Sequence, residues 1–275
     1  MSGILMPLIG VSGQESLKIS GPGVLSNLSL WYNASSGQTL YNGVLTNNFQ
    51  INPVTDGTEI TKWKDISGVG ADANRYNQGA ATGPTYKTNI QNGLSALLYS
   101  SANKNNLDIN PIGTWEQNQT GFTIYVVGRW TTLGASAIQI AVTDDNVGHQ
   151  WTGSYWKVGA AGGVATAQST TINTNIWTIH GMIFNGSYTN ADTALQNAGR
   201  LVYRYNRLPQ TLTFSANVGT STSNLSTVFY AGGNNRNTPK SYMDGYLGEI
   251  LIWTRAITAT EALQVETYIG DKWKI

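Results

Sequence analysis

Short runs that alternate between apolar and polar residues recur through most of the chain. Such runs predict β-strands, because successive side chains of a strand point to opposite faces of a sheet. Their spacing, roughly 8–12 residues, is typical of an all-β chain with two packed antiparallel sheets. The predicted strands cover residues 28–34, 59–63, 94–99, 107–109, 122–130, 138–142, 151–158, 177–184, 201–205, 227–231 and 247–253.

The strand predicted at residues 247–253 is apolar on both faces, apart from Glu249. We therefore expect protein to cover both of its sides. Burying an unpaired carboxylate is costly, so Glu249 should have a partner, either a backbone turn or a nearby Arg or Lys.

One helix is predicted, close to the C-terminal end. Thr258 and Glu261 have the spacing of a capping box, which marks a helix start. Ala262, Val265 and Ile269 follow at helical spacing and form one apolar stripe. The pattern thus predicts a two-sheet antiparallel sandwich with one short C-terminal helix.

Residues 1–27 differ from the rest, because glycines and Pro22 interrupt every run before a long element can form. We interpret them as an N-terminal arm before a single domain, residues 28–275. No Lys or Arg precedes the first apolar run and Pro7 interrupts it, so we expect an arm rather than a cleaved signal peptide. The apolar residues expected to pack on a neighbouring subunit are Ile4, Leu5, Met6, Leu8, Ile9 and Val11.

Composition narrows the possible partners. Only 11% of the 275 residues are charged and the formal net charge is +1, so we expect no nucleic-acid partner, which would require a concentrated basic face. No stretch approaches the length of a membrane span, so no membrane partner is expected either. Cysteine is absent, which excludes disulfides and thiol redox chemistry.

Aromatic residues that lie close to polar ones suggest sugar binding, because a sugar ring offers apolar C–H faces together with hydroxyl groups. Two segments have this composition, one around residues 151–156 and one around residues 234–242. An alternative interpretation is that most of these aromatic residues fill the core. The candidate carbohydrate-binding residues are Trp151, Tyr155, Trp156, Asn235, Arg236 and Tyr242.

Metal binding and catalysis have weaker signals. Asp144, Asp145 and Asn146 form the best cluster of oxygen ligands for calcium, although a solvated turn explains the same residues. No cofactor other than this calcium is expected.

Glycosidases need two carboxylates in one cleft, and Glu249 has no second acid two or four residues away. His149 and His180 are isolated in the sequence, so we expect no enzymatic activity.

Several motifs together resemble concanavalin A-like, laminin-G-like jelly-roll domains, of the kind found in bacteriophage structural proteins and bacterial surface proteins. The resemblance extends over residues 28–275. The motifs are residues 31–34 (Trp-Tyr-Asn-Ala), 63–68 (Trp-Lys-Asp-Ile-Ser-Gly), 71–73 (Ala-Asp-Ala), 84–86 (Pro-Thr-Tyr), 92–97 (Asn-Gly-Leu-Ser-Ala-Leu) and the closing strand with its helix.

The resemblance implies an all-β jelly-roll sandwich whose closing strand lies beside the start of the domain. It also implies that Trp63, Asp65, Ser67 and Gly68 form a structural turn. The family often carries an acid where this chain has Asn33, so a carboxylate that could order the first turn is missing at this position.

The fold itself does not determine a function. The resemblance favours a non-enzymatic structural protein on a virion surface, either a capsid decoration protein or a fibre or tail component. Its partners would be other virion proteins, further copies of the chain as a homo-oligomer, or both. The alternative is an extracellular or cell-surface adhesion module that recognises a polysaccharide. A glycoside hydrolase is the least favoured interpretation.

Overall fold

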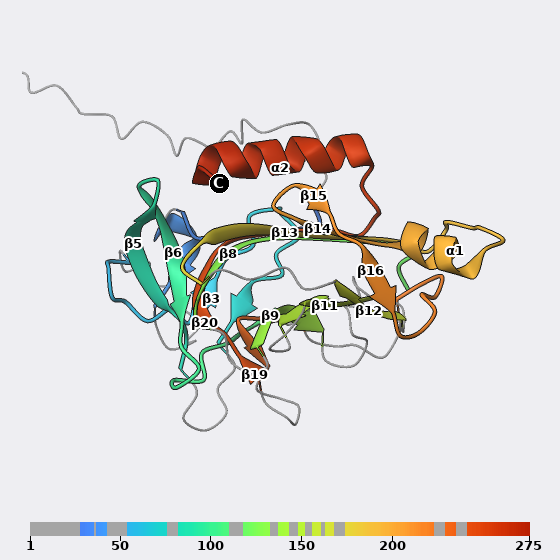
Figure 1. The fold of residues 1–275 in the computed structure, drawn as a ribbon. Coiled ribbons are helices and arrows are strands. Elements are labelled where there is room, and N and C mark those ends of the chain that lie inside the picture. Colours follow the sequence, from blue (N-terminus) through green and yellow to red (C-terminus); the bar gives the residue numbers. More distant parts are fainter. Residues whose placement is uncertain are drawn as a thin grey trace, which may run out of the picture.

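Two antiparallel sheets face each other, and helix α2 (Ala259–Trp273) lies along the outer side of one of them (Figure 1). This arrangement confirms the predicted two-sheet sandwich with a C-terminal helix. The computed structural model describes residues 28–35, 37–42, 54–75, 82–109, 118–132, 137–142, 148–151, 156–160, 163–167, 174–222, 229–234 and 241–275.

Sheet I is the sheet that α2 covers. Its strands lie in the order β15-β14-β13-β8-β20-β6-β5, and β1 also pairs with β20. The first predicted strand therefore lies beside the last one, as the resemblance implied. The strands are β1 (Leu30–Asn33), β5 (Thr85–Gln91), β6 (Leu94–Tyr99), β8 (Gly121–Thr132), β13 (Trp177–Asn185), β14 (Leu201–Tyr205), β15 (Leu208–Pro209) and β20 (Asp244–Trp253).

Sheet II is the opposite layer, with the order β16-β12-β11-β10-β9-β17-β7-β4-β3-β2. A separate two-stranded ribbon pairs β18 (Gly233–Asn234) with β19 (Ser241–Tyr242). The strands of sheet II are β2 (Leu40–Tyr41), β3 (Lys62–Trp63), β4 (Ala73–Asn74), β7 (Leu107–Ile109), β9 (Ala137–Val142), β10 (Gly148–Trp151), β11 (Trp156–Ala160), β12 (Gly163–Ala167), β16 (Leu212–Phe214) and β17 (Phe229–Ala231).

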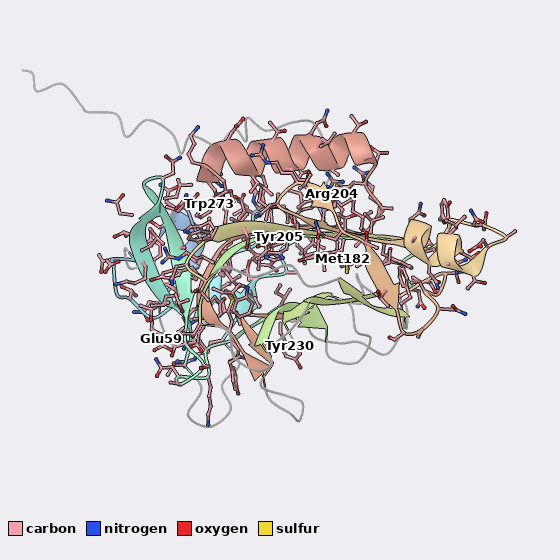
Figure 2. All side chains as sticks on the ribbon, in the orientation of Figure 1. Glu59, Met182, Arg204, Tyr205, Tyr230 and Trp273 are labelled. Carbon is pink, nitrogen blue, oxygen red and sulfur yellow. The ribbon has the colours of Figure 1, made fainter. Side chains whose placement is uncertain are left out.

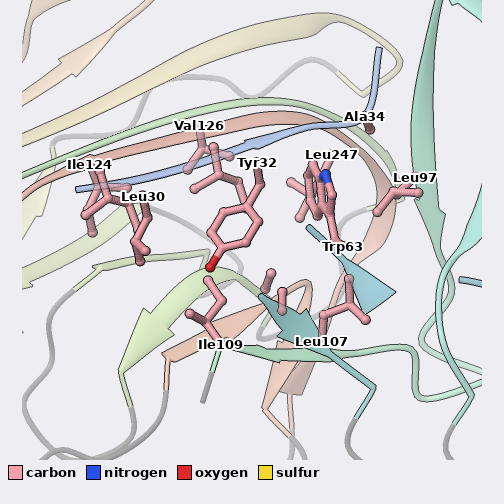
Figure 3. Close-up of a cluster of buried hydrophobic side chains, with 14 of the residues drawn as sticks. Leu30, Tyr32, Ala34, Trp63, Leu97, Leu107, Ile109, Ile124, Val126 and Leu247 are labelled. Atoms are coloured by element: carbon pink, nitrogen blue, oxygen red, sulfur yellow. The ribbon is translucent and has the colours of Figure 1, made fainter. Parts of the chain in front are cut away.

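The main core lies between the two sheets (Figure 3). Leu30 and Val126 enter it from sheet I, and Ile109 enters it from sheet II. Tyr32 extends from β1 toward sheet II, and its phenol hydroxyl donates a hydrogen bond to the carbonyl of Ala71. The alternation seen in the sequence thus marks which residues reach the core.

A second core lies between sheet I and α2, so β20 is covered on both sides as predicted. The capping box of Thr258 and Glu261 is present, and it fixes the start of α2. The predicted stripe of Ala262, Val265 and Ile269 is fully buried against the sheet.

The structure also contains a helix that the sequence pattern did not predict. A second helix, α1 (Thr193–Arg200), begins after Asp192, whose carboxylate accepts hydrogen bonds from the backbone of residues 194 and 195. Its buried residues are Asn197 and Arg200, both of them polar. The helix therefore has no apolar stripe that the sequence pattern could have revealed. A short 3-10 turn, η2 (Gly37–Thr39), precedes β2.

A carboxylate orders the turn that the resemblance described as structural. Asp65 is buried, and its two oxygens accept hydrogen bonds from the backbone of Trp31, Ser67 and Gly70 at 2.9 Å each. The Ser67 hydroxyl adds a fourth bond at 2.8 Å. Asn33 replaces the acid in part, because its Oδ1 accepts a hydrogen bond from the backbone of Ser35 as a carboxylate oxygen could.

Candidate functional site

A row of polar and aromatic side chains crosses sheet II on the face turned away from the core. Five neighbouring strands contribute one residue each, and every residue is the direct Cα partner of the next. Their chain neighbours Leu40, Trp63, Ala73, Leu107 and Ala231 all lie in the core, so the row must point outward. The row runs from β2 to β17 as Tyr41, Lys62, Asn74, Asp108 and Tyr230.

At the β2 end of the row, the side chains are partly exposed. The ammonium of Lys62 lies 2.5 Å from a carboxylate oxygen of Asp72 and 5.8 Å from the centre of the Tyr41 ring. The Asn74 amide donates to the backbone carbonyl of Asp72 at 2.9 Å. This end of the face thus combines an aromatic ring, an ion pair and an amide.

At the β17 end, the side chains are inaccessible to solvent although they point away from the core. The exposed fractions of Asn106, Asp108 and Tyr230 are 0%, 3% and 0%. The Asn106 amide donates to Asp108 at 3.2 Å, while its carbonyl oxygen Oδ1 has no hydrogen-bond partner among the described residues. An unsatisfied buried acceptor costs about 1–3 kcal/mol, so it marks a place where a water or a ligand group would be stabilising.

Figure 2 places Tyr230 at sheet II, on the opposite side of the molecule from Trp273 and Arg204, which lie beside α2. We call the outward row together with Asp72 and Asn106 the outer face of sheet II. Aromatic rings stand at both of its ends, and amide, carboxylate and ammonium groups lie between them.

Two further buried carboxylates lie on the α2 side of sheet I. Glu249 accepts hydrogen bonds from the indoles of Trp31 and Trp273 at 2.8 and 3.0 Å, and from the Lys272 ammonium at 2.8 Å. The prediction that Glu249 needs a partner is confirmed. Both of its oxygens are occupied, which makes it a structural group that ties β1 and β20 to α2.

The second carboxylate, Glu266, was missed by the sequence reasoning. It is fully buried and pairs with Arg204, while the Tyr125 hydroxyl donates to it at 3.0 Å. Burial raises the pKa of Tyr125, and the charge of Glu266 raises it further. Glu266 lies four residues after Ala262, within the buried stripe of α2, and this acid on an apolar helix face was the available signal.

His180 is a structural strand residue, in agreement with its predicted position. It lies in β13 and is fully buried, with Nδ1 at 2.7 Å from the Tyr203 hydroxyl and Nε2 at 2.9 Å from the Thr178 hydroxyl. Both ring nitrogens therefore have partners inside the core, so the burial of His180 is explained without a bound ligand.

The residues predicted to bind sugar are only partly covered by the structure. Trp151 and Trp156 are direct partners across the β10–β11 pair of sheet II, and Tyr242 lies in β19 opposite Gly233. The remaining candidates lie outside the described residues, namely Tyr155, Asn235, Arg236, the calcium cluster Asp144, Asp145 and Asn146, and the arm residues Ile4, Leu5, Met6, Leu8, Ile9 and Val11.

Among the described residues, no three His, Cys, Asp or Glu side chains come together as metal ligands would. In the same part of the chain, neither helix has the length and apolar character needed to span a membrane. The outer face of sheet II was not predicted, because its residues come from segments far apart in the sequence.

No protein-family model matches the chain, and no curated protein sequence matches it. Among solved structures, it is similar to Trypanosoma rangeli sialidase in complex with sialic acid, with 10% identity, 90% of this chain and 33% of that chain covered, and a TM-score of 0.50. The same enzyme with a 2,3-difluoro-KDN ligand gives 10% identity, the same coverage and a TM-score of 0.51.

A further similar structure is the CBM40 of the Ruminococcus gnavus IT-sialidase bound to α2,3 sialyllactose. It has 14% identity, covers 55% of this chain and 84% of that chain, and has a TM-score of 0.36. This chain spans about a third of the length of the T. rangeli sialidases that it matches. At 10% identity, the likeness to the T. rangeli structures shows a shared fold alone. None of the three names a virion protein, so the predicted virion role stays a prediction.

Proposed function

We propose that this protein is a non-catalytic carbohydrate-binding module that binds an oligosaccharide on the outer face of sheet II. The observation that carries the proposal is the partly exposed end of the row, from Tyr41 to Asn74. The Tyr41 ring can pack against the C–H face of a sugar ring. The groups of Lys62 and Asn74 beside it offer donors and acceptors to hydroxyl groups.

The row also suggests the size and direction of the ligand. The partly exposed residues Tyr41, Lys62 and Asn74 span two strand spacings, which is about 10 Å at about 4.8 Å per spacing. A single sugar ring would cover only part of that distance. The proposed ligand is therefore an oligosaccharide, or a segment of a polysaccharide, that crosses the strands at right angles.

The absence of catalysis is part of the proposal. Glu249 and Glu266 are held by indole, ammonium, phenol and guanidinium donors on the α2 side of sheet I. On the outer face, a carboxylate oxygen of Asp72 lies 2.5 Å from the ammonium of Lys62 and is engaged in that ion pair. Glycoside hydrolysis instead needs two carboxyl groups that face one bond of the substrate.

The proposal places the protein outside a cell or on its surface, where polysaccharides are exposed. The arm lies outside the described residues, so its role in assembly remains a prediction made from the sequence. Calcium at Asp144 also remains a prediction, and the binding test should therefore be run with and without this ion.

Glycan-array screening of the full chain, followed by calorimetry with the best ligand, tests the proposal. Tyr41→Ala should weaken binding by about tenfold, or about 1.4 kcal/mol, because it removes one aromatic platform from a partly exposed position. Asn74→Ala should weaken it as well. Tyr188→Ala is the matched control, because Tyr188 is exposed next to α1 and away from the row.

Three results would count against the proposal. The first is no glycan binding with or without calcium, and the second is binding that Tyr41→Ala and Asn74→Ala leave unchanged. The third is that the protein releases sugar from the ligand and that Asp108→Asn abolishes this release. That result would indicate a glycoside hydrolase.

A further inference from the structure

Helix α2 carries a shallow groove on the side that faces away from sheet I. The groove has a volume of about 590 Å³ and follows the helix through Thr260, Leu263, Gln264, Thr267, Tyr268, Asp271 and Lys272. These positions recur every three or four residues, so they form one stripe along the length of the helix. Leu263 lies in this stripe with 54% of its surface exposed.

A single exposed leucine is ordinary on a protein surface, and Leu208 is exposed as well. The α2 groove differs because its lining is largely uncharged over most of its length. Its charged residues, Asp271 and Lys272, are adjacent near the C-terminal end of the helix and have opposite signs. An apolar, uncharged segment would therefore fit most of the groove without burying a charge.

The chain enters the sandwich close to the start of α2. Leu28 packs in the core between sheet I and α2, in the same cluster as Ile257 and Ala262. The next residue, Ser29, donates its backbone N–H to the carbonyl of Ile252 at 2.8 Å, and its hydroxyl lies 3.0 Å from that of Thr254. Leu28, to which residues 1–27 are attached, therefore lies close to the N-terminal end of α2.

The length of this N-terminal segment is sufficient to reach every part of the groove. The 15 residues of α2 extend over about 22 Å at about 1.5 Å per residue. The 16 residues between Val11 and Leu28 can extend over as much as about 53 Å at about 3.3 Å per residue. The glycines at positions 13, 21 and 23 allow the chain to change direction on the way.

We propose that the α2 groove binds residues 4–11 of the same chain. This segment contains Ile4, Leu5, Met6, Leu8, Ile9 and Val11 and no charged side chain, which matches the uncharged lining of the groove. The arm then covers Leu263 and adds a layer to the sandwich from outside. This inference is independent of the proposed function, because α2 and sheet II lie on opposite sides of sheet I (Figure 1).

Thiol labelling of the full chain tests the inference, and the absence of native cysteine makes the labels unambiguous. A cysteine introduced by Thr267→Cys should react about tenfold more slowly than one introduced by Leu208→Cys, which corresponds to about 1.4 kcal/mol of docking free energy. Adding Leu8→Asp and Ile9→Asp should restore fast labelling at position 267. Equal rates at positions 267 and 208 in the unmodified arm would overturn the inference.

Cross-linking identifies the chain that supplies the arm. Oxidation of a full chain carrying Ile9→Cys and Gln264→Cys should give a disulfide within the monomer, and protection at position 267 should not change on dilution. A disulfide-linked dimer, together with protection that is lost on dilution, would overturn the assignment to the same chain and indicate a second copy instead.

Discussion

Arg204 and Glu266 form a two-point ion pair beneath helix α2. The guanidinium Nε lies 2.6 Å from one carboxylate oxygen, and Nη2 lies 2.9 Å from the other. Arg204 belongs to β14 and Glu266 belongs to α2, so the pair joins sheet I to the helix that covers it. Figure 2 shows Arg204 between these two layers.

Breaking this pair should destabilise the protein strongly. Glu266→Gln keeps the size of the side chain but leaves the Arg204 charge without its partner, so we expect a loss of about 3–5 kcal/mol in the free energy of unfolding, measured with urea. Asp56→Asn is the control, because it breaks the exposed pair with Lys87 and should leave the midpoint unchanged. Equal midpoints for the two variants would mean that the buried pair adds nothing.

The Asp65 turn offers a graded test. Asp65→Ala removes the acceptor of four hydrogen bonds, and we expect a loss of about 3 kcal/mol in unfolding free energy. Asp65→Asn keeps an oxygen for the bonds from Trp31 and from the Ser67 backbone, which share Oδ1, so its loss should be smaller. Losses of the same size would contradict the role given to each oxygen.

The α2 capping box should make stability depend on pH in acid. Hydrogen bonds from Arg255, and then those from Thr258, lower the pKa of Glu261 from its usual 4.5 to about 2. Because the folded-state pKa is depressed, the contribution of Glu261 is complete above about pH 4.5 and disappears as the pH falls toward 2. Glu261 is mostly solvated, so we expect a small effect.

Thermal unfolding of the protein and of Glu261→Gln across this pH range measures that contribution. The two melting temperatures should differ at pH 6 and converge near pH 2. A difference that stays constant across the range would assign the effect of the substitution to something other than the ionisation of Glu261.

Gly248 allows the close contact between β20 and the end of α2. A Cβ added to it would lie 2.3 Å from the Trp273 ring, so Gly248→Ala should cost about 1–3 kcal/mol in unfolding free energy. Gly37→Ala is the comparison, because its nearest atom, the Tyr86 hydroxyl, is 3.3 Å away and can shift. If Gly37→Ala proves as harmful as Gly248→Ala, the contact with Trp273 is not the cause.

Features that depend on neighbouring residues could be predicted from the sequence. The two-sheet sandwich and the capping box of Thr258 are both present. The requirement of Glu249 for a partner is confirmed as well. Each of these features is visible within a window of a few residues.

Features without a local pattern could not be predicted. Helix α1 was missed because its buried residues, Asn197 and Arg200, are polar and satisfied by contacts from elsewhere in the chain. The partners of Glu266 could not be found either, because Arg204 lies 62 residues away in the sequence.

The sequence alone determined that side chains alternate between the two faces of each strand, that the strands form a sandwich, and that a helix covers one sheet. Those properties follow from the period of each strand and helix. Tertiary structure alone decided which outward residues stand side by side on sheet II. Tyr41 and Tyr230 come from opposite ends of the chain, and only the pairing of five strands places them in one row with Asp108 between them. Strand register between distant segments is a property of the whole fold, and the candidate site depends on it.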